Sequence, residues 1–227
     1  MELLVEDYEI APENEVLKRY YHIDPNETDY YAVRTTIDKL LFNTYLFYPD
    51  TGYRLFEKMD EVIENRDDDD YIVMYINDLR DNFLNSKTTH LLSLYGKEWL
   101  AEMLGEEHPC YDDIRHISNK INGLFLYKGQ DDENVWVEHI ASGKRFLMTK
   151  ESFDHHRTLK EIDTIVLLGI VKWQDRWWFS GVFTQVDFSA DIVLDQKNSV
   201  ESRKQVDFLN YGSQEQLRLF LSKKVYF

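Results

Sequence analysis

The spacing of apolar residues changes near residue 120, and this change constrains the fold more than any other feature of the chain. Before it, apolar positions recur at intervals of three and four residues, as at Ile37, Leu41, Tyr45 and Tyr48. After it, short runs rich in β-branched and aromatic residues alternate with turn residues. The first pattern is typical of amphipathic helices and the second of strands. We therefore predict an α+β fold with a helical first half and a β-rich second half.

Three regions follow from this pattern. Residues 1–120 are predicted to form an acidic helical domain, built as an antiparallel bundle with Pro49 to Gly52 as one of its turns. Residues 121–187 are predicted to form a small five-stranded antiparallel β-barrel, with strands near 124–127, 134–140, 145–149, 162–173 and 176–183. Residues 188–227 are predicted to be a C-terminal helical segment that packs on the rest.

The charge is distributed as unevenly as the periodicity. The chain has a formal net charge of −16, and residues 1–120 hold 27 acidic and 12 basic side chains. A surface of this sign repels phosphate backbones and anionic lipid, so nucleic-acid binding and membrane binding are not expected. It suits a basic protein partner instead.

The cysteine count and the apolar runs bear on the compartment. Cys110 is the only cysteine, so no intramolecular disulfide is expected. The longest apolar run, Ile165 to Val171, is far too short for a membrane helix. The N-terminus has neither the basic nor the apolar region of a secretory signal. We expect a cytoplasmic protein without a membrane span.

Residues 123–183 carry a recognisable order of elements. Gly123-Leu124-Phe125-Leu126 is followed by the turn Ser142-Gly143-Lys144, the polar Lys150-Glu151-Ser152, the strand entry Ile162-Asp163-Thr164 and the final Trp178-Phe179-Ser180-Gly181-Val182. This order resembles a small β-barrel segment of uncharacterised bacterial proteins, some of which carry a SEC-C zinc motif near the chain end. The resemblance implies an all-β subdomain in a bacterial cytosolic protein. It transfers no zinc site, because that motif needs several cysteines.

Three tryptophans mark the last predicted hairpin. Trp177 and Trp178 are adjacent, so in a strand they point to opposite faces and only one can fill the barrel. The other is expected to pack against the helical unit and join the two parts. The alternative is that these residues, together with Trp173, form an exposed aromatic platform for a ligand or partner.

Two clusters contain residue types that could carry chemistry. His108, Cys110 and His116 are metal-ligand types, but their spacing is not that of a standard zinc site, so no metal or other cofactor is expected. Asp154, His155 and His156 lie in a loop between two predicted strands, where a histidine oriented by a carboxylate could act as a general base. A solvated connection is the simpler interpretation of that loop.

The residues therefore favour a non-catalytic interaction or regulatory protein, of the inhibitor or immunity type, with an acidic binding surface. Its partner is not specified by the sequence, and neither is its oligomeric state. A small hydrolase that uses the loop at residues 154–156 is one alternative, and a structural accessory of an assembly is another. The interaction hypothesis predicts that acidic side chains are contiguous on the folded surface.

Overall fold

The computed structural model describes residues 10–44, 46–47, 49–64, 69–151, 154–185 and 197–199. Within these ranges it contains both helices and a five-stranded sheet, which confirms the predicted mixed α and β composition. The helical elements are α2 (Glu15–Tyr20), α3 (Tyr30–Asn43), α4 (Pro49–Glu64), α5 (Asp69–Ser86), α6 (Gly96–Leu104), α7 (Tyr111–Arg115) and the 3-10 helix η1 (Asp154–Thr158). The strands are β1 (Ile121–Gln130), β2 (Asn134–His139), β3 (Arg145–Thr149), β4 (Ile165–Trp173) and β5 (Arg176–Gln185).

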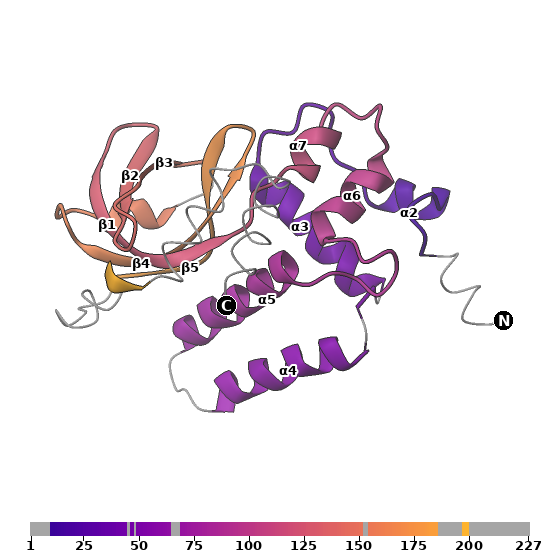
Figure 1. Cartoon of the computed structure of the whole chain (residues 1–227), viewed down its shortest axis with the longest axis horizontal. Helices are drawn as coiled ribbons and strands as arrows, with labels where there is room; N and C mark the ends of the chain where they lie inside the picture. Colours follow the sequence, from indigo (N-terminus) through magenta and orange to yellow (C-terminus); the bar gives the residue numbers. More distant parts are fainter. Residues whose placement is uncertain are drawn as a thin grey trace, which may run out of the picture.

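Helix α3 is the centre of the helical part. The Asp29 carboxylate caps its first turn by accepting a hydrogen bond from the Tyr31 backbone N–H at 2.9 Å. Val33, Leu40 and Leu41 are fully buried on one face of α3. Helices α6 and α7 pack together beside it, while α4 and α5 form a neighbouring pair (Figure 1).

One predicted connection of the helical part is wrong. Pro49 to Gly52 is the first turn of α4 and not a connection, because proline has no N–H to lose in a first helical turn and its φ is already helical. Helix α6 begins at Gly96. The backbone at Leu92 and Ser93 is left-handed, with φ of 61° and 53°, and this turn precedes the helix.

The five strands are hydrogen-bonded in the order β1-β2-β3-β5-β4, and β4 pairs back onto β1, so the strand order closes on itself. Four of the neighbouring pairs are antiparallel. The pair β3 and β5 is parallel, through Met148 and Trp177, so the sheet is mixed and the all-antiparallel prediction is wrong. Of the two last strands only β5 pairs with β3, and β4 lies between β5 and β1, antiparallel to both.

The hairpin of β4 and β5 joins the sheet to the helices. Its turn is Gln174-Asp175, as predicted, with φ of 47° and 60° at these two residues. Val171, Trp173 and Trp178 belong to the same buried cluster as the helical residues Val33 and Leu40. A separate apolar cluster, which includes Phe125, Val137 and Met148, fills the sheet. One end of the hairpin is therefore part of the helical core.

Helix α5 lies against β5, alongside this hairpin (Figure 1). No helix within the described ranges is both long enough and apolar enough to cross a membrane. The predicted C-terminal helical segment, residues 188–227, lies outside the described residues apart from 197–199.

Candidate functional site

Within the described part of the chain, the outer face of α4 is an exposed apolar surface. Tyr53, Phe56 and Ile63 are 65%, 53% and 49% exposed, although side chains of this size are usually covered. Among residues 53–64 of α4, whose side chains the structure describes, Leu55 is buried, and Met59 and Val62 are half-buried. The side of α4 that packs inward is therefore only part of its apolar stripe.

Acidic side chains share this outer face. Successive residues of a helix are turned by about 100°, so Asp60 falls between Phe56 and Tyr53, and Glu57 and Glu64 lie just beyond Tyr53. All three carboxylates are exposed. The exposed Glu61 follows Glu57 around the helix, and the two bases of α4, Arg54 and Lys58, come next, on the side away from Phe56 and Ile63. We call Tyr53, Phe56, Asp60, Ile63, Glu57 and Glu64 the α4 face.

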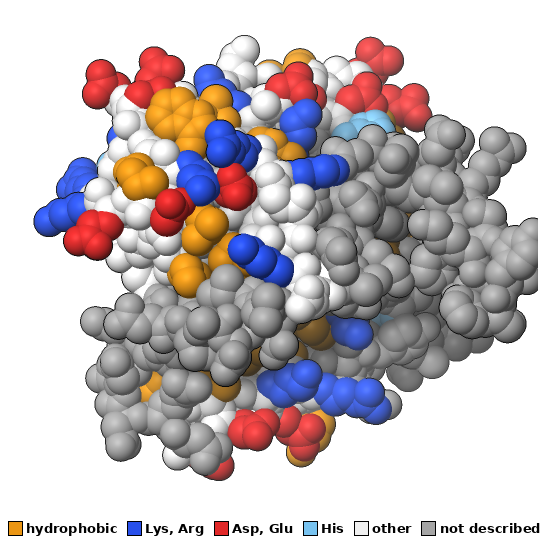
Figure 2. All heavy atoms as spheres, turned by 60° about the vertical axis from the view of Figure 1, so that its left-hand side comes forward, with side chains coloured by type: hydrophobic (Ala, Val, Ile, Leu, Met, Phe, Trp, Pro, Cys, Tyr) orange, Lys and Arg blue, Asp and Glu red, His pale blue; other side chains and the backbone are white. Residues whose placement is uncertain are grey.

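The sheet side of the molecule has a different surface. Figure 2, which brings this side forward, shows basic and acidic side chains interspersed around apolar ones on the described part of the surface. Surface ion pairs such as Arg145 with Glu138, at 2.9 Å, and Lys128 with Asp163, at 2.5 Å, balance these charges locally. The segregation of acids from bases on α4 is not repeated here.

A buried polar cluster lies where α3 and α5 meet β5. The Asp81 carboxylate is fully buried, and it pairs with Lys120 at 2.7 Å and with the Nε atom of Arg34 at 3.1 Å. The Ser180 hydroxyl donates a third contact to it at 2.6 Å. Burial alone would raise the pKa of Asp81, but Lys120 and Arg34 outweigh it and hold that pKa below its usual value. Asp81 is therefore a charged carboxylate with both oxygens engaged.

A β-bulge in β5 supplies backbone groups to the same cluster. The pairing between β4 and β5 shifts between Leu168 and Ile170, and Gly181 in the irregular stretch has a φ of 77°. The Val182 N–H, freed from the ladder, donates to Asp78 at 3.1 Å. Asp78 also pairs with Lys120, at 2.8 Å. The bulge thus turns the backbone of β5 towards α5.

Tyr30 and Tyr31 complete the junction. The Tyr31 hydroxyl donates to the backbone carbonyl of Phe179 at 2.7 Å, and the Tyr30 hydroxyl lies 3.5 Å from the Ser180 hydroxyl. Burial, reinforced by the charge of Asp81, raises the pKa of both phenols far above the ordinary value. Both side chains stay protonated at any physiological pH and act as hydrogen-bonding groups.

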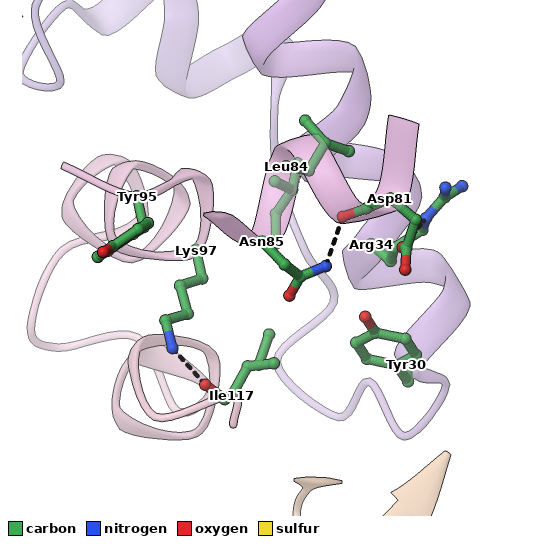
Figure 3. A pocket seen from close by; sticks show the side chains of 9 residues that line it. Tyr30, Arg34, Asp81, Leu84, Asn85, Tyr95, Lys97 and Ile117 are labelled. Atoms are coloured by element: carbon green, nitrogen blue, oxygen red, sulfur yellow. Dashed lines mark hydrogen bonds and ion pairs between the residues drawn. The ribbon is translucent and has the colours of Figure 1, made fainter. Parts of the chain in front are cut away.

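Two hollows meet at this cluster. A cleft of about 350 Å³ is lined by Tyr30, Tyr31, Arg34, Asn77, Asp81, Asp154, Phe179, Ser180, Gly181 and Phe183. A second hollow of about 30 Å³, the size of one water molecule, lies on the other side of Arg34 and Asp81. Figure 3 shows Lys97 pointing across it to the Ile117 carbonyl oxygen, and Asn85 donating to the backbone of Asp81. Burial lowers the pKa of Lys97.

The three tryptophans do not form an exposed platform. Trp173 and Trp178 are 2% and 0% exposed, and their rings lie 6.1 Å apart in the helical core, beside Tyr30. Trp177 points the other way, with its ring 4.8 Å from that of Phe146 at the core of the sheet. Trp177 and Trp178 thus point to opposite faces of β5, as predicted, and Trp178 is the one that packs against the helical unit.

The candidate metal ligands are engaged with backbone groups. His108 accepts a hydrogen bond from the Cys110 N–H at its Nδ1 atom, and its Nε2 atom lies 3.0 Å from the Ile23 carbonyl oxygen. Cys110 is buried, and burial raises the pKa of its thiol. His116 contacts the Asp112 carbonyl oxygen of its own helix. In the part of the chain that the structure describes, His, Cys, Asp and Glu form no cluster suited to a metal ion.

The loop with Asp154, His155 and His156 forms η1, between β3 and β4 as predicted. The Asp154 side chain is 88% exposed and pairs with Arg157 at 3.4 Å, while the backbone carbonyl of His156 accepts from Gln130. Asp154 reaches the edge of the larger cleft. A solvated carboxylate with an arginine partner is a poor orienting group for a general base.

Sequence reasoning did not single out the buried cluster. Arg34, Asp81, Lys120 and Ser180 are far apart in the chain, and only the fold brings them together. The α4 face does have a signal in the sequence. Once the helix is known to start at Pro49, the positions of its acidic and basic residues around the helix axis follow from the sequence. Comparison with known proteins found no family model, no curated relative and no solved structure that matches this chain.

Proposed function

We propose that this protein is a non-catalytic interaction protein that binds a partner protein through the α4 face. The observation that carries the proposal is the combination of three exposed large apolar side chains, Tyr53, Phe56 and Ile63, with acidic residues on one side of one helix. Exposed apolar groups rimmed by charge are typical of surfaces that another protein covers.

The composition of the α4 face specifies the chemistry of its partner. Burying Tyr53 and Phe56 against apolar groups would contribute about 1.5–3 kcal/mol for each side chain. Asp60, Glu57 and Glu64 would then face basic side chains at the rim, where they raise the association rate and exclude acidic competitors. We infer a partner segment that is amphipathic and basic, such as a helix with lysine or arginine beside its apolar stripe.

The hydrolase alternative has less support. Its carboxylate, Asp154, is solvated and held by Arg157. The α4 face, in contrast, places exposed acidic side chains next to one another, as binding to a basic partner requires, and adds exposed apolar side chains that the sequence hypothesis did not place there.

The proposal can be tested with three synthetic helical peptides that share one apolar stripe and differ only in having basic, neutral or acidic flanks. Fluorescence anisotropy should detect binding of the basic peptide at low salt, weakening as salt rises. The double variant F56S/I63S should lose at least tenfold in affinity. The triple variant E57Q/D60Q/E64Q should bind more weakly and lose its salt dependence.

The matched control is R54Q/K58Q, which changes the charged flank of the same helix outside the α4 face. This variant should bind the basic peptide at least as well as the original protein. Equal binding of all three peptides, or loss of binding in the control alone, would contradict the proposal. Sedimentation of the protein alone adds a further check: self-association abolished by F56S/I63S would identify the face as a contact between copies of this chain.

A further inference from the structure

The larger cleft at the junction of α3, α5, η1 and β5 has the size and lining of a small-molecule site. Its volume of about 350 Å³ lies within the range of natural ligand pockets. It combines aromatic rings, from Tyr31 and Phe183, with planar polar side chains from Arg34, Asn77 and Asp154. The geometry points to a binding site for a small, uncharged, hydroxyl-rich molecule of about monosaccharide size.

The absence of net charge in the ligand follows from the ion pairs. Three charged residues line the cleft, and each has its counter-ion: Arg34 with Asp81 at 3.1 Å, Asp81 also with Lys120 at 2.7 Å, and Asp154 with Arg157 at 3.4 Å. An anion would meet the Asp81 and Asp154 carboxylates, and a cation would meet Arg34. A neutral ligand disturbs none of these pairs and loses less hydration on entry.

The polar lining suits hydroxyl groups. The Arg34 guanidinium is held to Asp81 through Nε at 3.1 Å, which leaves its two terminal nitrogens as donors. The exposed Asn77 amide both donates and accepts, and the exposed Asp154 carboxylate accepts. A ligand with several hydroxyl groups can both donate and accept at neighbouring positions, as this lining requires.

The walls of the cleft suit the apolar side of such a ligand. Tyr31 is fixed by its hydrogen bond to the Phe179 carbonyl, so the position of its ring is set before a ligand enters. Phe183 is partly exposed beside Phe179. Gly181, which is exposed in the bulge, lines the cleft as well.

The test uses saturation-transfer NMR and backbone amide shifts on the full chain. The probes are glucose, galactose, ribose and N-acetylglucosamine, with glutamate, citrate and spermidine as charged comparators. We expect at least one neutral sugar to bind at millimolar or lower concentration and to shift the amides of Asn77, Ser180 and Gly181. The charged comparators should leave those amides unshifted.

Two variants at the exposed rim, N77A and D154N, separate binding from folding. Each should weaken the sugar at least fivefold while the thermal midpoint stays unchanged. D132N, which alters an exposed acid in the turn between β1 and β2, is the control and should leave the affinity unchanged. The proposal is overturned if no neutral sugar shifts the cleft amides, if a charged comparator binds there more tightly, or if N77A and D154N bind as the original protein does. None of these results bears on the α4 face.

Discussion

His139 is a buried titratable residue whose environment makes a definite prediction about pH. Its side chain is fully buried, its Nδ1 atom pairs with the Ser142 hydroxyl at 2.9 Å, and its Nε2 atom has no hydrogen-bond partner among the described residues. Burial lowers the pKa of His139 from 6.5 to about 4. Between these values the unfolded chain binds a proton that the folded chain excludes, so the free energy of unfolding must fall on acidification.

We therefore expect the folded state to lose about 2 kcal/mol through His139 as the pH falls from 7 to 4.5, after allowance for partial solvent relaxation. Urea unfolding across this pH range gives the free energy of unfolding of the original protein and of H139Q, whose glutamine does not titrate. The change in the difference between the two with pH measures the contribution of His139. H22Q, at an exposed histidine, is the control and should follow the original protein. A constant difference between the original protein and H139Q at all pH values would refute the assignment.

Lys120 is the second residue whose removal has a predictable outcome. It neutralises Asp78 and Asp81 together, and it is itself almost completely buried. The variant K120M leaves Asp81 underpaired, so we expect a loss of about 3 kcal/mol in the free energy of unfolding at pH 7.

The pH dependence identifies the cause of that loss. Without Lys120 the folded pKa of Asp81 should rise above its unfolded value, so the destabilisation should be present above the new pKa and relieved as the pH falls through it. The double variant K120M/D81N removes the buried charge and should recover part of the lost stability at pH 7. Chemical denaturation of both variants between pH 4 and 8 measures this. A loss that is independent of pH and unrelieved by D81N would indicate lost packing instead.

At the scale of elements, the bulge of β5 requires glycine for two separable reasons. Gly181 has a left-handed φ of 77°, and a Cβ atom there would overlap with Lys120 Nζ and Asp78 Oδ1. Gly143, in the turn before β3, has a similar φ of 67° but nothing near the position of its missing Cβ. We predict that G143A costs about 1 kcal/mol and G181A about 3 kcal/mol, because only G181A also disrupts the buried cluster. Thermal and urea unfolding compare the two, and equal losses would exclude the steric contribution.

Local sequence patterns predict where helices and strands lie better than they predict which elements pair with one another. The Gln174-Asp175 hairpin and the opposite faces of Trp177 and Trp178 follow from backbone rules that act over a few residues, and both are observed. The parallel pairing of β3 with β5 depends on contacts between distant segments, which no local spacing records. The same limit applies to the site, because the apolar residues of α4 stand in the sequence but which of them neighbouring elements cover is a tertiary property, and Phe56 and Ile63 are exposed.

At the scale of the whole molecule, the hairpin of β4 and β5 couples the two kinds of structure. Trp173 and Trp178 lie in the helical core, whereas Trp177 lies at the core of the sheet, on the same two strands. Asp78, Lys120 and the Val182 N–H add a polar link between α5 and β5. If the helical part unfolds, Trp173 and Trp178 of the hairpin lose their contacts, and if the sheet unfolds, the hairpin no longer holds these two side chains in the helical core.

This coupling predicts that helices and sheet unfold together. Circular dichroism at about 222 nm reports the helix content. This signal and tryptophan fluorescence should give coincident urea transitions within error. The variant W178A removes the indole that anchors the hairpin in the helical core, and it should lower the midpoint of both signals by the same amount, with a loss of about 3–5 kcal/mol. The control L147A alters a half-exposed outer side chain of β3 and should shift the transition little. Trp99, Trp173 and Trp178 report on the helical core and Trp136 and Trp177 on the sheet, so a fluorescence transition with two steps, of which only one coincides with the loss of helix, would show that the helical part and the sheet are independent folding units.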